Sequence, residues 1–414
     1  MKLKVNKYRL DNGLKILINE DHSLPLVGYY TFFKVGSRNE RPGITGISHL
    51  FEHMMFNGSK KFGPKEFDRI LESNGGFSNA YTTRDITVYY ENFSPSAFRK
   101  VVEMEADRME NLALNETNLS FEREVVKEER RLRTDNSIMG IMEEQLYAAS
   151  FYAHPYRWPV IGWMSDLDNI TLKDCQDYYR KYYSPDNAVL VIIGDVNPLS
   201  SFEVIKDFYG NIPPGKIDNS VVTEEPEQKG ERRIKYFKEA NSISFCIGYH
   251  TVSVFDEDVF PLDLLQIILT YGGSSRLYRN LVLKKRVATS IFSEFAWRID
   301  PSLFVFYVRM KPGIKAEKGE EIIYNEIEKI KKKGITKKEL VKSKKIMEAE
   351  FIRTFKTISE KANKIGYYEA VLGDFNKLFE TLEKYRKCTI EQILNVVNKY
   401  FSENRRTVVT ILPE

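Results

Sequence analysis

The sequence predicts an α+β protein of two domains that are related by duplication. Three observations predict this class. The chain has 414 residues, which is more than one ordinary hydrophobic core holds. Residues 211–233 have the proline, glycine and charge content of a linker. On either side of that linker, residues 171–192 match residues 389–410 without a gap, and both read as a helix followed by an apolar strand.

The first half, expected as a domain over residues 1–212, contains signals for both strands and helices. Asp11-Asn12-Gly13 marks the turn of a hairpin. Residues 26–36 predict a strand that is apolar on both faces. Helices are expected at about 44–57, 64–74, 95–112 and 117–149, two Thr/Tyr-rich strands within 75–93, and an apolar strand at 187–195.

The second half is expected as a domain over residues 233–414, after a linker at 213–232. Its strands are expected at 233–250, 288–310 and 406–412, and its helices at 258–285 and 315–401.

The alignment of the two halves also concerns their chemistry. In the second half, Asp263 and Ile267 stand where the first half has His49 and His53. The second half therefore has no histidine at either of these two positions. The second domain is therefore expected to keep the fold and to have no metal site.

Composition excludes several classes of protein. A hydrophobic content of 42% and an aromatic content of 13% are typical of a globular protein rather than a disordered one. The net charge of +4 is small for this length and gives no case for nucleic acid or membrane binding. The N-terminus has no apolar core of signal-peptide length. We expect a cytoplasmic protein, with a periplasmic or exported location as the alternative if a signal has been removed.

The stretch His49-Leu50-Phe51-Glu52-His53 carries the strongest chemical signal. Its flanks are apolar with helical spacing. On a helix the two histidines lie about 40° apart, and Glu52 lies roughly 60° to the other side of His49. Two imidazoles one turn apart can share a metal ion, and a carboxylate beside them can take a proton from water. Two neighbouring core or surface histidines are the alternative interpretation.

A zinc site of this kind needs a third protein ligand. In residues 120–133, Glu122 and Glu129 are two helical turns apart and therefore on one face, within about 20°. Glu128 is an alternative to Glu129 as ligand. A solvated, Glu-rich helix is the alternative to any metal role for this segment.

Several segments resemble one known family, the pitrilysin/mitochondrial processing peptidase family of inverted zincins, and the resemblance covers nearly the whole chain. The residues around the histidine motif read GSRNERPGITGISHLFEHMMFNGS. The second metal motif reads FEREVVKEE. Further matching segments read GGFSNAYTTRDITVYY, HPYRWPVIGWMSDLDNIT and YYSPDNAVLVIIGDV.

This resemblance implies a fold and a metal site. The fold is two similar domains, each a mixed, mainly antiparallel sheet with helices on one face, paired as a clam shell. The implied cofactor is one Zn²⁺ per chain. The implied ligands are His49, His53 and Glu129, and Glu122 is implied as a carboxylate that orients a histidine or tunes the ligand carboxylate.

The resemblance also implies an activity, the zinc-dependent hydrolysis of peptide bonds in short or unfolded peptides. Glu52 takes a proton from water and returns it to the leaving amine. The strand at 76–82 resembles the edge strand that binds extended substrates in this family. Ser78, Asn79 and Ala80 are the residues implied to contact the peptide.

The chain departs from the family pattern in one place. Residues 274–290 read SSRLYRNLVLKKRVATS, and the family often has Arg and Tyr at the positions of Val282 and Thr289. Valine cannot donate a hydrogen bond, and threonine is too short to replace tyrosine. We therefore expect a dimer, either a heterodimer whose partner supplies the missing pair or a weakly active homodimer.

A non-catalytic assembly subunit of a larger complex is the alternative function. A zinc-dependent peptide-binding chaperone is a third possibility. Core-type subunits of this fold tend to lose metal ligands, whereas this chain keeps the full set, which favours the peptidase.

Overall fold

The computed structural model describes residues 3–215, 217 and 219–414. It contains two compact units, and each is described here by itself. The first unit comprises Met1–Arg130, Trp158–Val222 and Arg353–Phe379, and the second comprises Arg131–Arg157, Thr223–Ile352 and Glu380–Glu414. The change of unit at Val222–Thr223 falls within the expected linker. In addition, each half of the sequence contributes one segment to the other unit.

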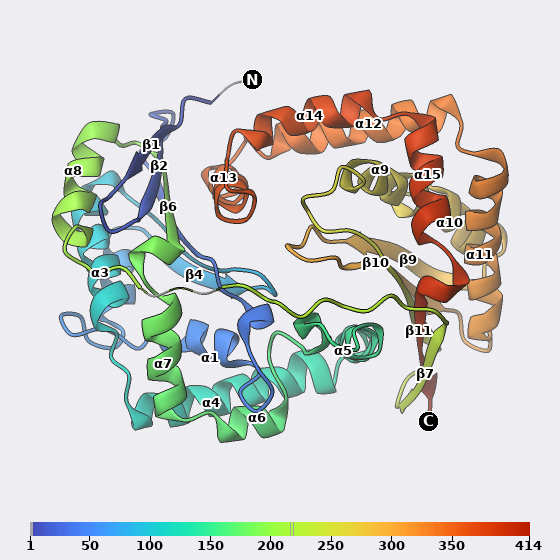
Figure 1. The fold of residues 1–414 in the computed structure, drawn as a ribbon, viewed down its shortest axis with the longest axis horizontal. Coiled ribbons are helices and arrows are strands. Elements are labelled where there is room, and N and C mark those ends of the chain that lie inside the picture. Colours follow the sequence, from blue (N-terminus) through green and yellow to red (C-terminus); the bar gives the residue numbers. More distant parts are fainter. Residues whose placement is uncertain (1–2, 216, 218) are drawn as a thin grey trace. The chain divides into compact units, whose positions relative to one another are not determined.

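The first unit is built on a six-stranded mixed sheet in the order β1-β2-β6-β3-β5-β4 (Figure 1). Strands β2 and β6 are parallel, and the other neighbours are antiparallel. Strand β4 is therefore an edge strand, paired only with β5. The strands span Asn6–Arg9 (β1), Lys15–Glu20 (β2), Val27–Phe33 (β3), Phe77–Thr82 (β4), Thr87–Phe93 (β5) and Ala188–Gly194 (β6).

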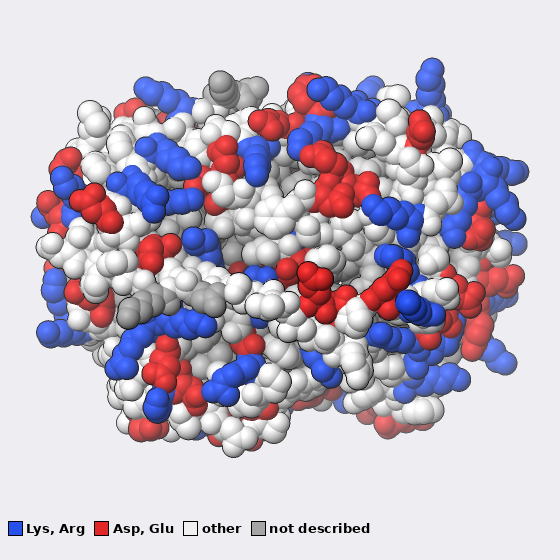
Figure 2. Space-filling model, in the orientation of Figure 1, with Lys and Arg blue, Asp and Glu red and all other residues white. Residues whose placement is uncertain are grey.

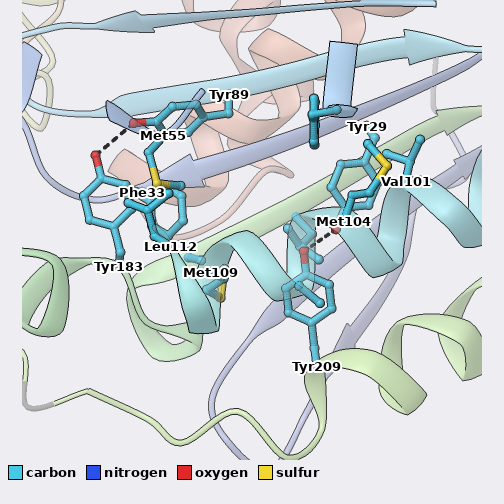
Figure 3. Close-up of a cluster of buried hydrophobic side chains, with 14 of the residues drawn as sticks. Tyr29, Phe33, Met55, Tyr89, Val101, Met104, Met109, Leu112, Tyr183 and Tyr209 are labelled. Atoms are coloured by element: carbon cyan, nitrogen blue, oxygen red, sulfur yellow. Dashed lines mark hydrogen bonds between the residues drawn. The ribbon is translucent and has the colours of Figure 1, made fainter. Parts of the chain in front are cut away.

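Most helices of the first unit pack on one face of this sheet. Their shared core includes two tyrosine pairs, shown in Figure 3: the hydroxyls of Tyr29 and Tyr209 lie 2.8 Å apart, and those of Tyr89 and Tyr183 lie 3.1 Å apart. These bonds satisfy hydroxyls that are removed from water. The helices span Ile47–Met54 (α1), Glu66–Ser73 (α2), Phe98–Asn111 (α3), Glu116–Arg130 (α4), Met164–Asn169 (α6), Leu172–Tyr182 (α7) and Pro198–Tyr209 (α8).

The opposite face of the sheet is covered by α13 (Ile358–Leu372), which comes from the second half of the sequence. Gly366 lies so close to Phe32 of β3 that a Cβ atom there would be 2.0 Å from the aromatic ring. The buried carboxylate of Glu369 forms ion pairs with Lys7 and Lys15 at 2.9 and 2.8 Å. This second cover explains why β3 is apolar on both faces, since all seven of its residues are buried.

The second unit repeats this plan. Its five strands are ordered β7-β11-β8-β10-β9, which is the order of β2-β6-β3-β5-β4 in the first unit, and β7 and β11 are parallel like β2 and β6. The strands span Arg232–Lys238 (β7), Ser244–His250 (β8), Ala288–Phe295 (β9), Leu303–Met310 (β10) and Arg406–Pro413 (β11). The predicted fold class, two duplicated α+β domains with mainly antiparallel sheets, is confirmed.

Helices cover both faces of the second sheet as well, whereas helices on only one face of each sheet were expected. One face packs against helices of the second half, and the other packs against α5 (Ile138–Ser150), which comes from the first half. Leu146 and Tyr147 of α5 share a buried cluster with Cys246, Val305 and Val409. The remaining helices span Val259–Thr270 (α9), Arg276–Tyr278 (α10), Ala316–Lys333 (α11), Lys337–Arg353 (α12), Lys377–Lys387 (α14) and Ile390–Tyr400 (α15).

The prediction of a single helix at 117–149 is wrong, because the structure has two helices there. Helix α4 ends at Arg130 and is followed by a π-helical turn, Arg131–Asp135. Helix α5 then begins after Ser137, whose side chain accepts a hydrogen bond from the N–H of Gly140 as an N-cap. The interruption lets α4 stay in the first unit while α5 enters the second.

The described part of the chain contains no helix with the length and apolar character of a membrane span. On the face drawn in Figure 2, basic and acidic side chains are interspersed, as expected from a net charge of +4.

Candidate metal centre

Helix α1 is held in place at its N-terminus by a buried carboxylate. The two oxygens of Glu40 accept hydrogen bonds from the N–H groups of Gly46 and Ser48 at 2.8 and 2.9 Å. Burial raises the pKa of Glu40 to about 8, and these hydrogen bonds oppose that rise. Gly46 has φ +89°, and a Cβ atom there would lie 2.5 Å from the carbonyl oxygen of Ile161. The backbone therefore approaches closely only because residue 46 is glycine.

Three side chains from α1 and α4 converge within the first unit. Oε2 of Glu129 lies 3.6 Å from Nε2 of His49 and 3.3 Å from Nε2 of His53. One ligand atom from each of these residues lies within 4.8 Å of the others. Among the described residues, no other group of three or more His, Cys, Asp or Glu side chains meets that condition. Glu128, the alternative ligand, is exposed on α4 and is not part of the group.

This donor set fits a zinc ion. Ligand atoms that hold a tetrahedral Zn²⁺ at about 2.0–2.1 Å lie roughly 3.3 Å from one another. The two measured nitrogen–oxygen distances, 3.3 and 3.6 Å, are close to that value. Two imidazoles and one carboxylate also leave the fourth position of the metal for water, as in catalytic zinc sites.

Glu122 contacts the opposite side of the His53 ring. Its Oε2 lies 3.3 Å from Nδ1 of His53, and its Oε1 accepts a hydrogen bond of 2.9 Å from the amide of Asn57. Burial lowers the pKa of His53, but hydrogen bonds with Glu122 and Glu129 outweigh it and raise the pKa to about 9. A carboxylate on Nδ1 places the proton there and leaves Nε2 as the metal-binding atom.

Glu52 lies on the same helix between the two histidines in sequence. Its Oε2 accepts a hydrogen bond of 2.5 Å from the hydroxyl of Thr82, the last residue of β4. Glu52 is only partly buried, so water can reach it. The helix therefore presents a carboxylate, a group able to accept a proton, next to the histidines of the converging group.

The segment expected to bind peptide is the edge strand β4. The N–H of Ala80 donates to Oδ1 of Asn79 at 2.8 Å, and the hydroxyl of Ser78 donates to Asp68 of α2 at 3.3 Å. An edge strand offers N–H and C=O groups to which a further strand can be added.

The two positions that depart from the family pattern are engaged within the second unit. Val282 packs against the core of that unit. The hydroxyl of Thr289 donates to the carbonyl oxygen of Arg309 at 3.1 Å.

Sequence reasoning missed three residues of this site: Glu40, Asn57 and Thr82. Glu40 and Asn57 lie in the segment around the histidines that resembles the peptidase family, but no separate role was predicted for either residue. Thr82 lies two residues beyond the expected peptide contacts. Its side chain is on the same face of β4 as Ser78 and Ala80, because alternate residues of a strand share a face. That alternation was the available signal.

Two family models match the chain, and the second match begins before the linker and runs across it. Residues 15–162 match the family model "Insulinase (Peptidase family M16)", and residues 169–347 match "Peptidase M16 inactive domain". The histidine motif, Glu122 and Glu129 lie within the first match, and Asp263 and Ile267 lie within the second.

Similar proteins match over nearly the full chain. "Zinc protease PqqE" of Helicobacter pylori is 34% identical, over 98% of this chain and 92% of that protein. "Uncharacterized zinc protease YmxG" of Bacillus subtilis is 26% identical, over 97% of this chain and 96% of that protein. The crystal structure of a protease from Helicobacter pylori matches with a TM-score of 0.94 and 34% identity, covering 100% of both chains.

Proposed function

Because this chain belongs to peptidase family M16, we propose that it is a zinc-dependent endopeptidase that hydrolyses short or unfolded peptides. The observation that carries the proposal is the convergence of His49, His53 and Glu129, with Glu52 on the same helix as the two histidines. The names of the similar zinc proteases support zinc as the metal. One ion per chain is proposed, held by these three side chains.

When bound, zinc would act as a Lewis acid that polarises the scissile carbonyl and lowers the pKa of water, so that water can lose a proton and attack near neutral pH. The protein residues supply the proton transfers. Glu52 accepts a proton from the attacking water and then donates it to the nitrogen of the leaving amine. Its partial exposure leaves it accessible to water, and its carboxylate is the basic group that this role requires.

Glu122 acts through His53 rather than on the substrate. Its carboxylate accepts the Nδ1 proton of His53 and directs Nε2 towards Glu129. Asn57 in turn holds Glu122. Such partners of a ligand fix its tautomer and ring orientation.

The peptide is proposed to bind in extended form along β4, at Ser78, Asn79 and Ala80. Because the side chain of Ser78 already bonds Asp68, the backbone of this strand is the proposed contact. A substrate carbonyl would replace Oδ1 of Asn79 at the N–H of Ala80, which frees the Asn79 amide to bond the peptide. The resulting strand pairing favours substrates without folded structure.

We further propose that the active species is a dimer, and that a related subunit supplies the Arg/Tyr pair missing at Val282 and Thr289. The packing of Val282 and the backbone bond of Thr289 support this, since valine has no hydrogen-bond donor and the proton of the Thr289 hydroxyl is already donated to the carbonyl oxygen of Arg309. The test compares turnover by the chain alone with turnover after mixing with a related chain that has both residues. Full turnover by the isolated chain would remove the heterodimer and leave a homodimer.

The experiment that tests the function itself is metal analysis combined with a peptide assay. The purified protein is expected to hold about one zinc per chain and to cleave an unfolded peptide, and a chelator should abolish cleavage until zinc is restored. A chain without zinc or turnover would instead be the non-catalytic assembly subunit. Zinc with peptide binding but without cleavage would indicate a chaperone. Fractionation of the native cells separates the expected cytoplasmic location from an exported one.

A further inference from the structure

The edge strand β4 and the catalytic carboxylate are directly connected by one side chain. The hydroxyl of Thr82 donates to Oε2 of Glu52 at 2.5 Å. Thr82 is two residues from Ala80, on the strand that is proposed to bind the peptide. The proposed general base is thus hydrogen-bonded to a side chain of the proposed peptide-binding strand before any substrate arrives.

The direction of this hydrogen bond is fixed by its surroundings. A carboxylate with its proton removed can only accept, so the hydroxyl must donate. The neighbouring hydroxyl, that of Thr87 on β5, lies 3.5 Å from the Thr82 hydroxyl as a weak donor to it, and donates to the carbonyl oxygen of Val35 at 3.0 Å. Thr82 therefore gives its one proton to Glu52, and hydrogen bonds to a charged acceptor are the stronger kind.

Side chains hold β4 from both faces of the sheet. On the face that carries α1 and α2, Thr82 bonds Glu52 and Ser78 bonds Asp68. On the face that carries α13, the hydroxyl of Tyr81 donates to Oδ1 of Asn363 at 2.8 Å. These bonds add to the pairing with β5, which is the only strand neighbour of β4 in the described sheet.

The consequence for Glu52 is geometric. A glutamate side chain has three rotatable bonds, and a partly exposed one samples several rotamers. A donor on Oε2 selects one orientation of the carboxylate that is proposed to take the proton from water. A general base must be held within about 0.5 Å of its productive position for proton transfer to be efficient.

We infer that Thr82 is a positioning residue for Glu52, and that it links the peptide-binding strand to the orientation of the general base. The inference rests on the proposed peptidase function and deepens it. A peptide that pairs along β4 is held in register with the same strand end that holds Glu52. Substrate position and base position are therefore set by one structural element.

The test uses the full-length, zinc-loaded protein and one unfolded peptide substrate. Thr82→Val keeps the shape of the side chain and removes the hydroxyl. It is expected to lower kcat on the order of 10-fold, because one preorganised hydrogen bond to a catalytic group is lost. KM and zinc content should stay within about twofold of the unmodified protein, because no ligand or peptide contact is removed. Thr82→Ser, in contrast, keeps a hydroxyl at this position and should keep most of the kcat that Thr82→Val loses.

Tyr81→Phe is the matched control. It removes one hydroxyl bond from the adjacent residue of the same strand, on the opposite face. If Thr82 acted only by stiffening β4, both variants would lower kcat alike. We expect kcat of Tyr81→Phe to stay close to that of the unmodified protein. Equal losses in the two variants, full kcat in Thr82→Val, or no recovery in Thr82→Ser would each overturn the inference.

The outcomes also separate this inference from the function on which it rests. An unmodified protein that lacks zinc and turnover would refute the peptidase proposal and this inference with it. An active, zinc-containing protein whose Thr82→Val variant keeps full kcat would refute only the positioning role. Thermal unfolding of each variant identifies any loss of activity that comes from misfolding.

Discussion

Oε2 of Glu122 lies 3.3 Å from Nδ1 of His53, on the side of the ring away from Glu129. We predict that Glu122→Gln weakens zinc binding about 10- to 100-fold, because an amide orients the imidazole less well than a carboxylate and does not raise its basicity. Competition with a zinc-binding dye measures the change. Glu124→Gln is the control, since Glu124 is on the same helix and forms a salt bridge with Lys127 at 3.0 Å. Unchanged zinc affinity in Glu122→Gln would contradict the assigned role.

Glu129 and its neighbour Glu128 make a second matched pair. Glu129→Gln is expected to lose most of the bound zinc, since the neutral amide is a poor substitute for the carboxylate ligand. Glu128→Gln should keep zinc near one per chain, because Glu128 is exposed and lies outside the converging group. Metal analysis after gel filtration measures both. The reverse result would make Glu128 the ligand.

Glu52→Gln separates metal binding from proton transfer. The amide has nearly the same shape but cannot accept a proton, so turnover should fall by at least about 10³-fold. Zinc content should be unchanged, since Glu52 is not among the three converging ligands. A peptide cleavage assay on zinc-loaded protein measures the loss. An active Glu52→Gln enzyme would require another base.

The ion pair between Asp21 and Lys361, at 2.5 Å, ties α13 to the first unit and predicts a pH-dependent stability. The hydrogen bond from Lys361, together with those from Ser23, lowers the pKa of Asp21 from 3.8 to about 2. A carboxyl pKa that is lower in the folded state stabilises folding above about pH 4, and this contribution is lost as pH falls towards 2.

Asp21→Asn should therefore lower the free energy of unfolding by about 1 kcal/mol near pH 7, with a smaller effect near pH 3. Urea unfolding between pH 3 and 7 measures the difference. Asp207→Asn is the control, because Asp207 is exposed and its partner Arg99 is 3.6 Å away. A deficit in Asp21→Asn that grows towards low pH would contradict the assigned pKa shift.

Gly366 tests the packing of α13 on β3. A Cβ atom at this position would lie 2.0 Å from the buried ring of Phe32, so Gly366→Ala forces the helix or the ring to move. We expect a loss of about 1–3 kcal/mol in the free energy of unfolding. Gly230→Ala, where no atom lies within 4 Å of the added carbon, should be close to neutral. Chemical unfolding of both variants makes the comparison. Equal stabilities would mean that α13 is not tightly packed there.

Much of the fold was predictable because its signals are local or repeated. The constant offset between residues 171–192 and 389–410 predicted a duplication, and α7 and α15 indeed begin after capping threonines, Thr171 and Thr389, at equivalent positions. The exchange of α5 and α13 between the units was not predictable. A strand that is apolar on both faces, such as β3, indicates that two covers exist, but its sequence does not specify which segment supplies the second one.

The sequence by itself determined that His49, Glu52 and His53 lie together, because residues within one helical turn have fixed angular positions. It also narrowed the third ligand to a carboxylate of one helix. Only the tertiary structure decided that Glu129 rather than Glu128 faces the histidines, that Glu122 contacts His53, and that Thr82 contacts Glu52. The reason is physical: helical periodicity sets directions within one element, whereas distances between elements depend on how their cores pack.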